Sequence, residues 1–344
     1  MKNSLYYTFS TMALCMLLAT GCRSGAPVRT AESIAAHAPA PPPARWVGLI
    51  GEFGPDEEVR TVLERDGALV LHSRSDEHEL VERGVAQFEL RGHGALAPVT
   101  FAVGMDGRAT ILMFSGVALD RRQSGPESGG QLLVPKVRPL DELRREAAVS
   151  TPPVEAGPFL PTDLVELTKL DSTIQLDIRY ATSNNLFGAP FYTQARAFLQ
   201  RRVAEAVVRA NAALRPLGYG ILVHDGYRPW TVTKMFWEAA PMDKRIFFAD
   251  PAEGSKHNRG AAVDLTLYEL RTGRAVEMPG TYDETTNRSY SDYPGGTSRQ
   301  RWHRALLRRA MEAERFVVDP LEWWHFDHAD WRRYPIGNMP FEGM

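Results

Sequence analysis

The sequence predicts an α+β protein in which a small all-β domain precedes a larger domain with a central, mainly antiparallel sheet flanked by helices. In residues 46–120, short apolar or alternating runs are separated by turn signals such as Asp66-Gly67 and Asp106-Gly107. That pattern is typical of an antiparallel meander. From about Leu164 the pattern changes, and helical periodicity alternates with a few strand-like runs, which favours an α+β domain.

Each expected element follows from its residue pattern. In the first domain, apolar or alternating runs predict strands over residues 46–50, 68–71, 86–90, 99–103 and 109–114. In the second domain, similar runs predict strands over residues 174–178, 220–224, 263–267 and 321–326. Helices are predicted over residues 197–214, 230–239 and 299–315, the last of them rich in arginine.

The first residues of the chain have the composition of an export signal. Lys2 supplies a positive charge, and the apolar run from Met12 to Ala19 is too short to span a bilayer. The segment Leu18–Cys22 (Leu-Ala-Thr-Gly-Cys) resembles a bacterial lipobox. We therefore predict a lipoprotein-type signal peptide over 1–22 with Cys22 as the lipidated residue, the alternative being an ordinary cleaved signal. Residues 23–45, rich in alanine and proline, would form a tether.

This leader predicts an exported protein of the cell envelope. The anchor at Cys22 would hold it on a membrane, facing the periplasm, and Arg23 in place of aspartate favours the outer membrane. The only other cysteine, Cys15, also lies in the leader, so the mature chain has no disulfide, no cysteine nucleophile and no zinc-thiolate site. Any catalysis must use oxygen and nitrogen ligands.

The length of 344 residues fits a leader followed by two domains. We place a β-rich accessory domain at 46–125, a linker at 126–163 and the α+β domain at 164–344. The linker contains the prolines Pro152, Pro153 and Pro161. The formal net charge of -2 gives no electrostatic case for a nucleic-acid partner, which usually requires a clearly basic domain.

Four residues of the second domain have the chemistry of a catalytic metal site. His257 and Asp264 are separated by small residues that let the backbone turn closely, and Glu322 and His325 follow later in the chain. Two imidazoles and an aspartate suit a catalytic zinc site, in which three protein ligands leave a fourth position for water. A spare glutamate is then free to act as general base on that water.

Each of these residues also has a structural explanation. A lone histidine is more often structural than a ligand. In a strand, Glu322 and His325 would point to opposite faces, so both reach one metal only if the chain bends between them. The alternative is that Trp323 and Trp324 are core aromatics flanked by incidental polar residues.

Arg228 lies in the segment Asp225–Pro229, directly after a run that reads as a buried strand. A fixed guanidinium beside a zinc ion could stabilise a tetrahedral oxyanion. The alternative is a surface arginine at a turn.

Taken together, these segments resemble the D-alanyl-D-alanine dipeptidases, the VanX-type zinc peptidases. The resemblance covers residues from about 171 to 344. It depends on five ordered matches: Leu176–Thr182 with Asn184 and Asn185, Asp225–Pro229, Ser255–Leu267 (Ser-x-His-x-Arg-Gly-x-Ala-x-Asp-Leu-Thr-Leu), Tyr282-Asp283, and Leu321–His325.

The resemblance implies a zinc peptidase domain and assigns a role to each matched residue. One zinc ion per chain would be bound by His257, Asp264 and His325, with Glu322 as the catalytic base and Arg228 as the transition-state stabiliser. The substrate pocket would be lined by Ser255, Tyr180 and Asp283, with Asp283 meeting the free amino terminus. Such a carboxylate would reject longer peptides, because their equivalent nitrogen is an uncharged amide.

The predicted function is zinc-dependent hydrolysis of D-alanyl-D-alanine to free amino acids, in peptidoglycan turnover at the cell envelope. One alternative is a broader peptidoglycan carboxypeptidase or endopeptidase, against which Tyr282-Asp283 argues because it matches the dipeptide-limiting site. Another is a non-catalytic binding lipoprotein, against which the complete set of zinc and acid–base residues argues. The accessory domain, which lies outside the family pattern, could cap or restrict the pocket.

Overall fold

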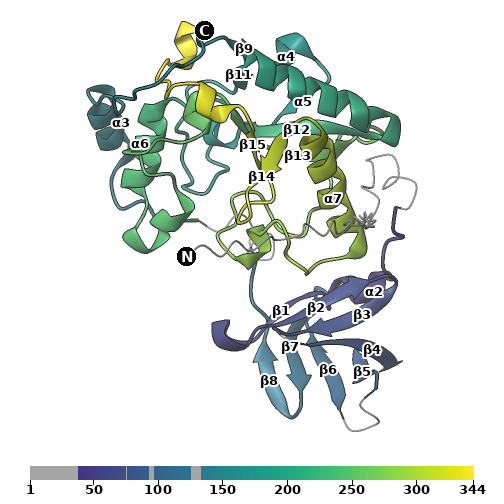
Figure 1. Cartoon of the computed structure of the whole chain (residues 1–344). Coiled ribbons are helices and arrows are strands. Elements are labelled where there is room, and N and C mark those ends of the chain that lie inside the picture. The colour runs from purple at the N-terminus through teal and green to yellow at the C-terminus, as the bar shows by residue number, and fades with distance from the viewer. Residues whose placement is uncertain (1–37, 75, 93–96, 125–132) are drawn as a thin grey trace, which may run out of the picture.

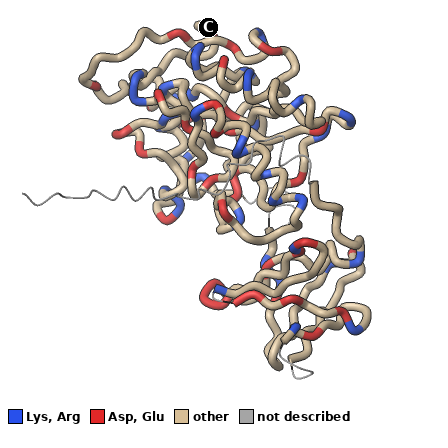
Figure 2. Tube along the Cα trace, turned by 45° about the vertical axis from the view of Figure 1, so that its right-hand side comes forward, with Lys and Arg blue, Asp and Glu red and all other residues tan. Residues whose placement is uncertain are grey.

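A computed structural model describes residues 38–74, 76–92, 97–124 and 133–344, and Figure 1 shows two bodies. The predicted signal peptide, the lipidation site Cys22 and most of the predicted tether lie outside the described residues. So do residues 126–132 of the predicted linker. Within the described residues, no helix is long and apolar enough to span a membrane. Acidic and basic residues are interspersed over both bodies in Figure 2, consistent with the small net charge.

The first body is one sheet of eight antiparallel strands in sequential order. Its core is formed by residues such as Phe53, Val62, Leu69, Phe88 and Leu112. Asp66-Gly67 turns the chain between the second and third strands, with φ angles of 51° and 85°. The elements are α2 (Ala44–Val47), β1 (Gly51–Phe53), β2 (Arg60–Arg65), β3 (Ala68–His72), β4 (Glu77–Gly84), β5 (Gln87–Leu90), β6 (Pro98–Val103), β7 (Ala109–Phe114) and β8 (Val117–Asp120).

The strand predicted over residues 46–50 is wrong. Trp46 lies in the single helical turn α2, and the first strand begins only at Gly51. The proline run ends at Pro43, whose carbonyl accepts a hydrogen bond from the Trp46 amide at 2.9 Å. That bond closes a turn where the apolar pattern alone predicted extended backbone.

The second body is built on a five-stranded sheet in the order β10-β12-β13-β15-β14. Only the β10–β12 pair is parallel, so the sheet is mainly antiparallel, as predicted. The strands β9 and β11 form a separate pair. The elements are α3 (Leu140–Ala148), β9 (Leu164–Glu166), α4 (Leu167–Leu170), β10 (Gln175–Leu176), β11 (Phe198–Gln200), α5 (Arg201–Leu214), β12 (Tyr219–Asp225), α6 (Trp230–Ala239), β13 (Ala262–Glu269), α7 (Ser298–Ala313), β14 (Phe316–Val318) and β15 (His325–His328).

Three predicted elements of this body lose three or four residues of their predicted range. The helix predicted from residue 197 begins at Arg201, because residues 198–200 pair with β9. The strand predicted over 174–178 is reduced to the two residues of β10. The strand predicted over 321–326 starts only at His325, because Asp319 accepts the Leu321 amide at 2.9 Å and turns the chain.

The predicted linker is also more ordered than expected. It contains the helix α3, which packs against α6. Leu143 and Ala147 of α3 are buried in the core of the second body. Their spacing of four residues places both side chains on one helix face. This part of the predicted linker therefore belongs to the α+β domain.

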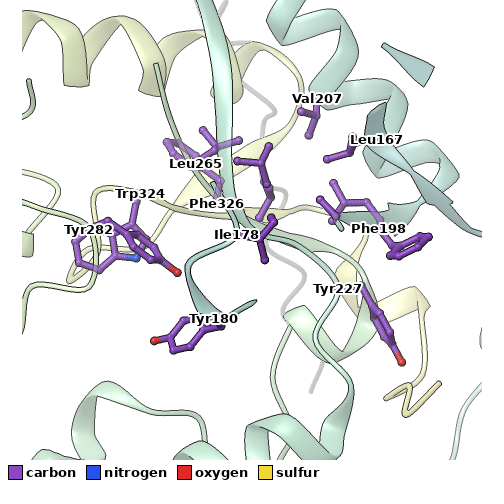
Figure 3. Close-up of a cluster of buried hydrophobic side chains, with 14 of the residues drawn as sticks. Leu167, Ile178, Tyr180, Phe198, Val207, Tyr227, Leu265, Tyr282, Trp324 and Phe326 are labelled. Atoms are coloured by element: carbon purple, nitrogen blue, oxygen red, sulfur yellow. The ribbon is translucent and has the colours of Figure 1, made fainter. Parts of the chain in front are cut away.

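The core of the second body lies on both sides of the sheet, and Figure 3 shows part of it. Val207 of α5 and Leu265 of β13 are fully buried, as is Phe326 of β15. On β13, Val263, Leu265 and Leu267 belong to this core. Successive side chains of a strand point to opposite faces, so Asp264 points away from these three residues.

Replacing Phe326 by alanine is expected to lower the free energy of unfolding by about 3–5 kcal/mol, because it leaves a cavity at a fully buried position. The matched control is Val317→Ala on the adjacent strand, where the side chain is 61% exposed and the expected change is about 0.5 kcal/mol or less. Urea unfolding followed by tryptophan fluorescence would measure both. Equal losses in the two variants would contradict the assigned core.

Candidate metal centre

Three potential metal ligands converge on one point from separate elements. Asp264 lies on β13 directly opposite His325, the first residue of the antiparallel neighbour β15. His257 lies in a short 3-10 turn just before β13. The His325 Nδ1 atom is 3.0 Å from Asp264 Oδ1 and 3.1 Å from His257 Nε2, and His257 Nε2 is 3.3 Å from Asp264 Oδ1.

These separations fit a tetrahedral metal ion. A zinc ion bound to nitrogen and oxygen ligands at roughly 2.0–2.1 Å requires ligand atoms about 3.3 Å apart. The three atoms meet that requirement closely, and they form a candidate metal-binding group among the described residues. The donor set of two imidazoles and one carboxylate suits zinc and leaves one position open.

Each candidate ligand is fixed by a hydrogen bond on its far side. His257 Nδ1 lies 2.7 Å from the Gly226 carbonyl oxygen, which leaves Nε2 for the metal. His325 Nε2 lies 2.9 Å from Asp327 Oδ1, which leaves Nδ1 for the metal. The Tyr282 hydroxyl donates to Asp264 Oδ2 at 3.1 Å. Such partners orient metal ligands and select the imidazole tautomer.

Electrostatics favour an ionised Asp264. Burial acts to raise the pKa of this carboxyl group, but the adjacent His257 and His325 outweigh burial and hold its pKa well below the usual value. The carboxylate is therefore available as a ligand over the whole physiological pH range.

Glu322 lies beside this group on the turn that precedes β15. The His325 amide donates to the Glu322 carbonyl at 3.1 Å, which is the bend that the spacing of these two residues requires. The Glu322 carboxylate is 3.8 Å from His325 Nδ1. Burial raises the pKa of Glu322 to about 7, although the neighbouring His325 acts to lower it. A carboxyl group with a pKa near neutrality is suited to take up and return a proton.

Arg228 is largely buried, with its side chain 12% exposed, and is not a surface arginine at a turn. Its Nε and Nη2 atoms donate to Asp225 Oδ2 at 3.0 and 2.7 Å. Its guanidinium also lies over the Phe236 ring, 4.8 Å from the ring centroid. Asp225 is itself held by the Tyr192 hydroxyl at 2.7 Å. The guanidinium is therefore fixed in one orientation, at the wall of the cavity that contains the candidate ligands.

A cavity of about 460 Å³ opens over the candidate ligands. The predicted substrate-binding residues Tyr180, Ser255 and Asp283 all line it, together with Glu322 and Arg228. Asp283 has a φ angle of 58°, a left-handed conformation that non-glycine residues rarely adopt. Its buried Oδ2 atom has no hydrogen-bond partner among the described residues. Burial, followed by the nearby Asp264, raises the pKa of Asp283 well above its usual value.

Sequence reasoning did not assign roles to Asp327, Tyr282 and Asp225, the residues that hold a candidate ligand or Arg228 in place. One signal for Asp327 was present in the sequence. His325 and Asp327 are two residues apart, and side chains with that spacing in a strand share a face. The hydrogen bonds of Tyr282 and Asp225 depend on tertiary contacts that the sequence pattern does not reveal.

Comparisons with known proteins match the sequence of this chain to peptidases. The family model described as D-ala-D-ala dipeptidase matches residues 161–338. The D-alanyl-D-alanine dipeptidase of Escherichia coli K12 is 31% identical over 175 residues, covering 51% of this chain and 89% of the relative. The enzymes of the same name from Enterococcus faecalis V583 and Enterococcus faecium are 34% and 33% identical, covering 46% and 49% of this chain and 87% and 92% of the relatives.

The site and these matches define a metallopeptidase. The chain belongs to the D-alanyl-D-alanine dipeptidase family. The resemblance inferred from the sequence motifs is thereby confirmed, and the match leaves the eight-stranded sheet outside the family region.

Proposed function

We propose that this protein is a zinc-dependent D,D-dipeptidase that hydrolyses D-alanyl-D-alanine to free D-alanine. The observation that carries the proposal is the convergence of His257, Asp264 and His325, with ligand atoms 3.0–3.3 Å apart, beside the carboxylate of Glu322. These three residues would hold one zinc ion. The family membership supplies the substrate class.

Bound zinc would supply Lewis acidity and lower the pKa of water at the site. Glu322 removes a proton from the attacking water as its oxygen adds to the peptide carbonyl carbon. Arg228 donates hydrogen bonds to the carbonyl oxygen as negative charge develops on it. Glu322 then returns the proton to the leaving nitrogen, the C–N bond breaks, and one water molecule has been added across it.

Asp283 would set the length of the substrate. Its buried carboxylate lines the cavity with an unpartnered oxygen, and a substrate ammonium would both satisfy that oxygen and favour the ionised form. An amide nitrogen in a longer peptide carries no charge and would not stabilise the ionised form of this buried carboxyl group. Tyr180 and Ser255 would complete the pocket around the dipeptide.

We propose an envelope location on the basis of the leader sequence. A lipid at Cys22 would anchor the chain to a membrane, and the enzyme would act on dipeptides released during peptidoglycan turnover. Membrane fractionation of the full-length chain and of Cys22→Ala tests this proposal. We expect the wild-type protein in the membrane fraction and the variant in the soluble fraction, and a soluble wild-type protein would contradict the anchor.

The function is tested by hydrolysis of three substrates by the zinc-loaded protein: D-Ala-D-Ala, L-Ala-L-Ala and a pentapeptide ending in D-Ala-D-Ala. Cleavage of D-Ala-D-Ala alone would support the dipeptidase and the role of Asp283. Cleavage of the pentapeptide would instead identify a carboxypeptidase with a broader substrate range. No cleavage of any of the three, with zinc bound, would refute the proposed reaction.

Asp327→Ala is expected to weaken zinc binding by about 10- to 100-fold, because His325 loses the hydrogen bond that fixes its ring. Asp330→Ala is the matched control, since Asp330 pairs with Arg315 and Arg333 and touches none of the candidate ligands. Zinc affinity can be measured by competition with a chromophoric chelator. Equal affinities in the two variants would show that Asp327 does not orient His325.

A further inference from the structure

The eight-stranded sheet does not form a wall of the catalytic cavity. Among the described residues, every residue that lines the cavity lies between Tyr180 and Trp331, within the second body. The described residues of the sheet therefore do not contact a substrate bound in this cavity. Its packing on the second body lies elsewhere, at the loop that joins β13 to α7.

The last part of this connection, residues 279–297, runs from the cavity to the sheet, and we call it the specificity loop. Near its start, Asp283 lines the cavity in a left-handed conformation. The adjacent Glu284 is buried and accepts hydrogen bonds from the Thr281 amide at 2.9 Å and the Thr286 hydroxyl at 2.8 Å. Arg288 Nε lies 3.0 Å from the same carboxylate. The first part of the loop is thus internally fixed around Glu284.

The far end of the specificity loop docks on β2. Strand β1 pairs with β2 only as far as Val62, so the edge of β2 beyond that residue is open to another partner. The Glu64 amide donates to the Gly296 carbonyl at 3.1 Å. The Glu64 carboxylate accepts the Ser298 amide at 2.7 Å. Glu64 is only 1% exposed, so these bonds are shielded from water.

Two arginines of α7 hold the same stretch of the loop from the other side. Arg301 donates to the carbonyls of residues 294, 295 and 296 at 3.0–3.2 Å, and also to the Glu64 carbonyl at 2.6 Å. Arg304 donates to the carbonyls of Tyr290 and Tyr293 at 3.2 and 2.9 Å. Burial lowers the pKa of Arg304 to about 10, so it remains charged at neutral pH. These contacts explain two of the five arginines of α7.

We propose that the eight-stranded sheet braces the specificity loop, and that Glu64 is a positioning residue for Asp283. The strained backbone at Asp283 persists only if the surrounding structure over-determines it. The contacts at Glu284 fix one end of the loop, and the β2 and α7 contacts fix the other. The role assigned to Asp283 depends on the proposed dipeptidase function, whereas the bracing of the loop does not.

Hydrogen–deuterium exchange of the full chain without substrate tests the brace directly. Glu64→Gln keeps the size of the side chain but replaces a charged acceptor. The two carboxylate oxygens of Glu64 accept the amides of Gly67 and Ser298, and a glutamine side chain has only one acceptor oxygen for them. The loss of a hydrogen bond to a charged group predicts roughly tenfold to hundredfold faster exchange in peptides covering residues 283–296. Glu79→Gln is the matched control, because Glu79 lies on the same sheet and pairs with the exposed Arg91. Unchanged exchange of the loop in Glu64→Gln would overturn the proposal.

A second variant distinguishes a loosened loop from an unfolded sheet. If strand peptides of β3 and β4 also exchange faster in Glu64→Gln, Arg301→Lys decides, because it weakens the brace from the α7 side. Faster exchange of the loop in Arg301→Lys, with protected β3 and β4, supports the brace. An unchanged loop in that variant refutes it.

Steady-state kinetics with D-Ala-D-Ala test the bracing of the loop separately from the proposed dipeptidase activity. If both hold, Glu64→Gln raises KM for D-Ala-D-Ala by roughly tenfold, with a smaller change in kcat, because the ammonium partner is displaced while Glu322 and the zinc ligands are not. A wild-type protein that does not cleave D-Ala-D-Ala would refute the proposed function and leave the exchange comparison valid. An unchanged KM alongside a loosened loop would show that the brace does not position Asp283.

Discussion

Glu322→Gln is expected to lower kcat for D-Ala-D-Ala by about 10²- to 10⁴-fold, the usual contribution of a positioned general base. The amide cannot take a proton from water or return one to the leaving nitrogen. The three candidate metal ligands are untouched, so the variant should still bind one zinc ion per chain. Steady-state kinetics and metal analysis of the purified variant measure the two properties separately.

Glu253→Gln provides the control for that experiment. Glu253 also lines the cavity but is not among the residues of the candidate metal group. Its activity should remain within a few-fold of wild type. Full activity in Glu322→Gln would eliminate Glu322 as the base, and loss of zinc from that variant would make it a metal ligand instead.

His257→Ala is expected to lose both zinc and measurable turnover. The remaining two ligands cannot form the three-ligand site that retains a catalytic zinc ion. Chelation of the wild-type protein should give the same loss of activity. Added zinc should restore the chelated wild-type protein but not the variant.

The control for this second experiment is His72→Ala, a partly exposed histidine of the first sheet that pairs with Glu77. It should retain zinc and activity. Circular dichroism of each variant establishes whether the fold persists without metal. A zinc-loaded and active His257→Ala protein would contradict the proposed ligand set.

The sequence was sufficient to place the candidate ligands because they belong to an ordered motif. Asp264 sits in an alternating strand pattern, and its position opposite His325 follows once β13 and β15 pair. The bend between Glu322 and His325 was not predictable, because it depends on a backbone hydrogen bond from the His325 amide to the Glu322 carbonyl. The pattern of apolar residues carries no information about that contact.

The strand β11 and the helix α3 were also not predicted from the sequence pattern. Residues 198–200 continue a helical pattern in the sequence, yet they pair with β9, a strand more than thirty residues earlier in the chain. Long-range pairing of this kind overrides local propensity. The helix α3 was missed because flanking prolines and polar residues obscured the short apolar spacing of Leu143 and Ala147.

The open edge of β2 has a consequence for handling the protein. An unpaired strand edge is a template for pairing with other chains, and native proteins usually cover it. Here Gly296 of the second domain covers that edge at Glu64. Cutting the chain between the two domains would expose this edge of β2. It would also remove the sheet from one side of the specificity loop, near the buried Tyr293. Each half alone should therefore aggregate more readily than the intact chain.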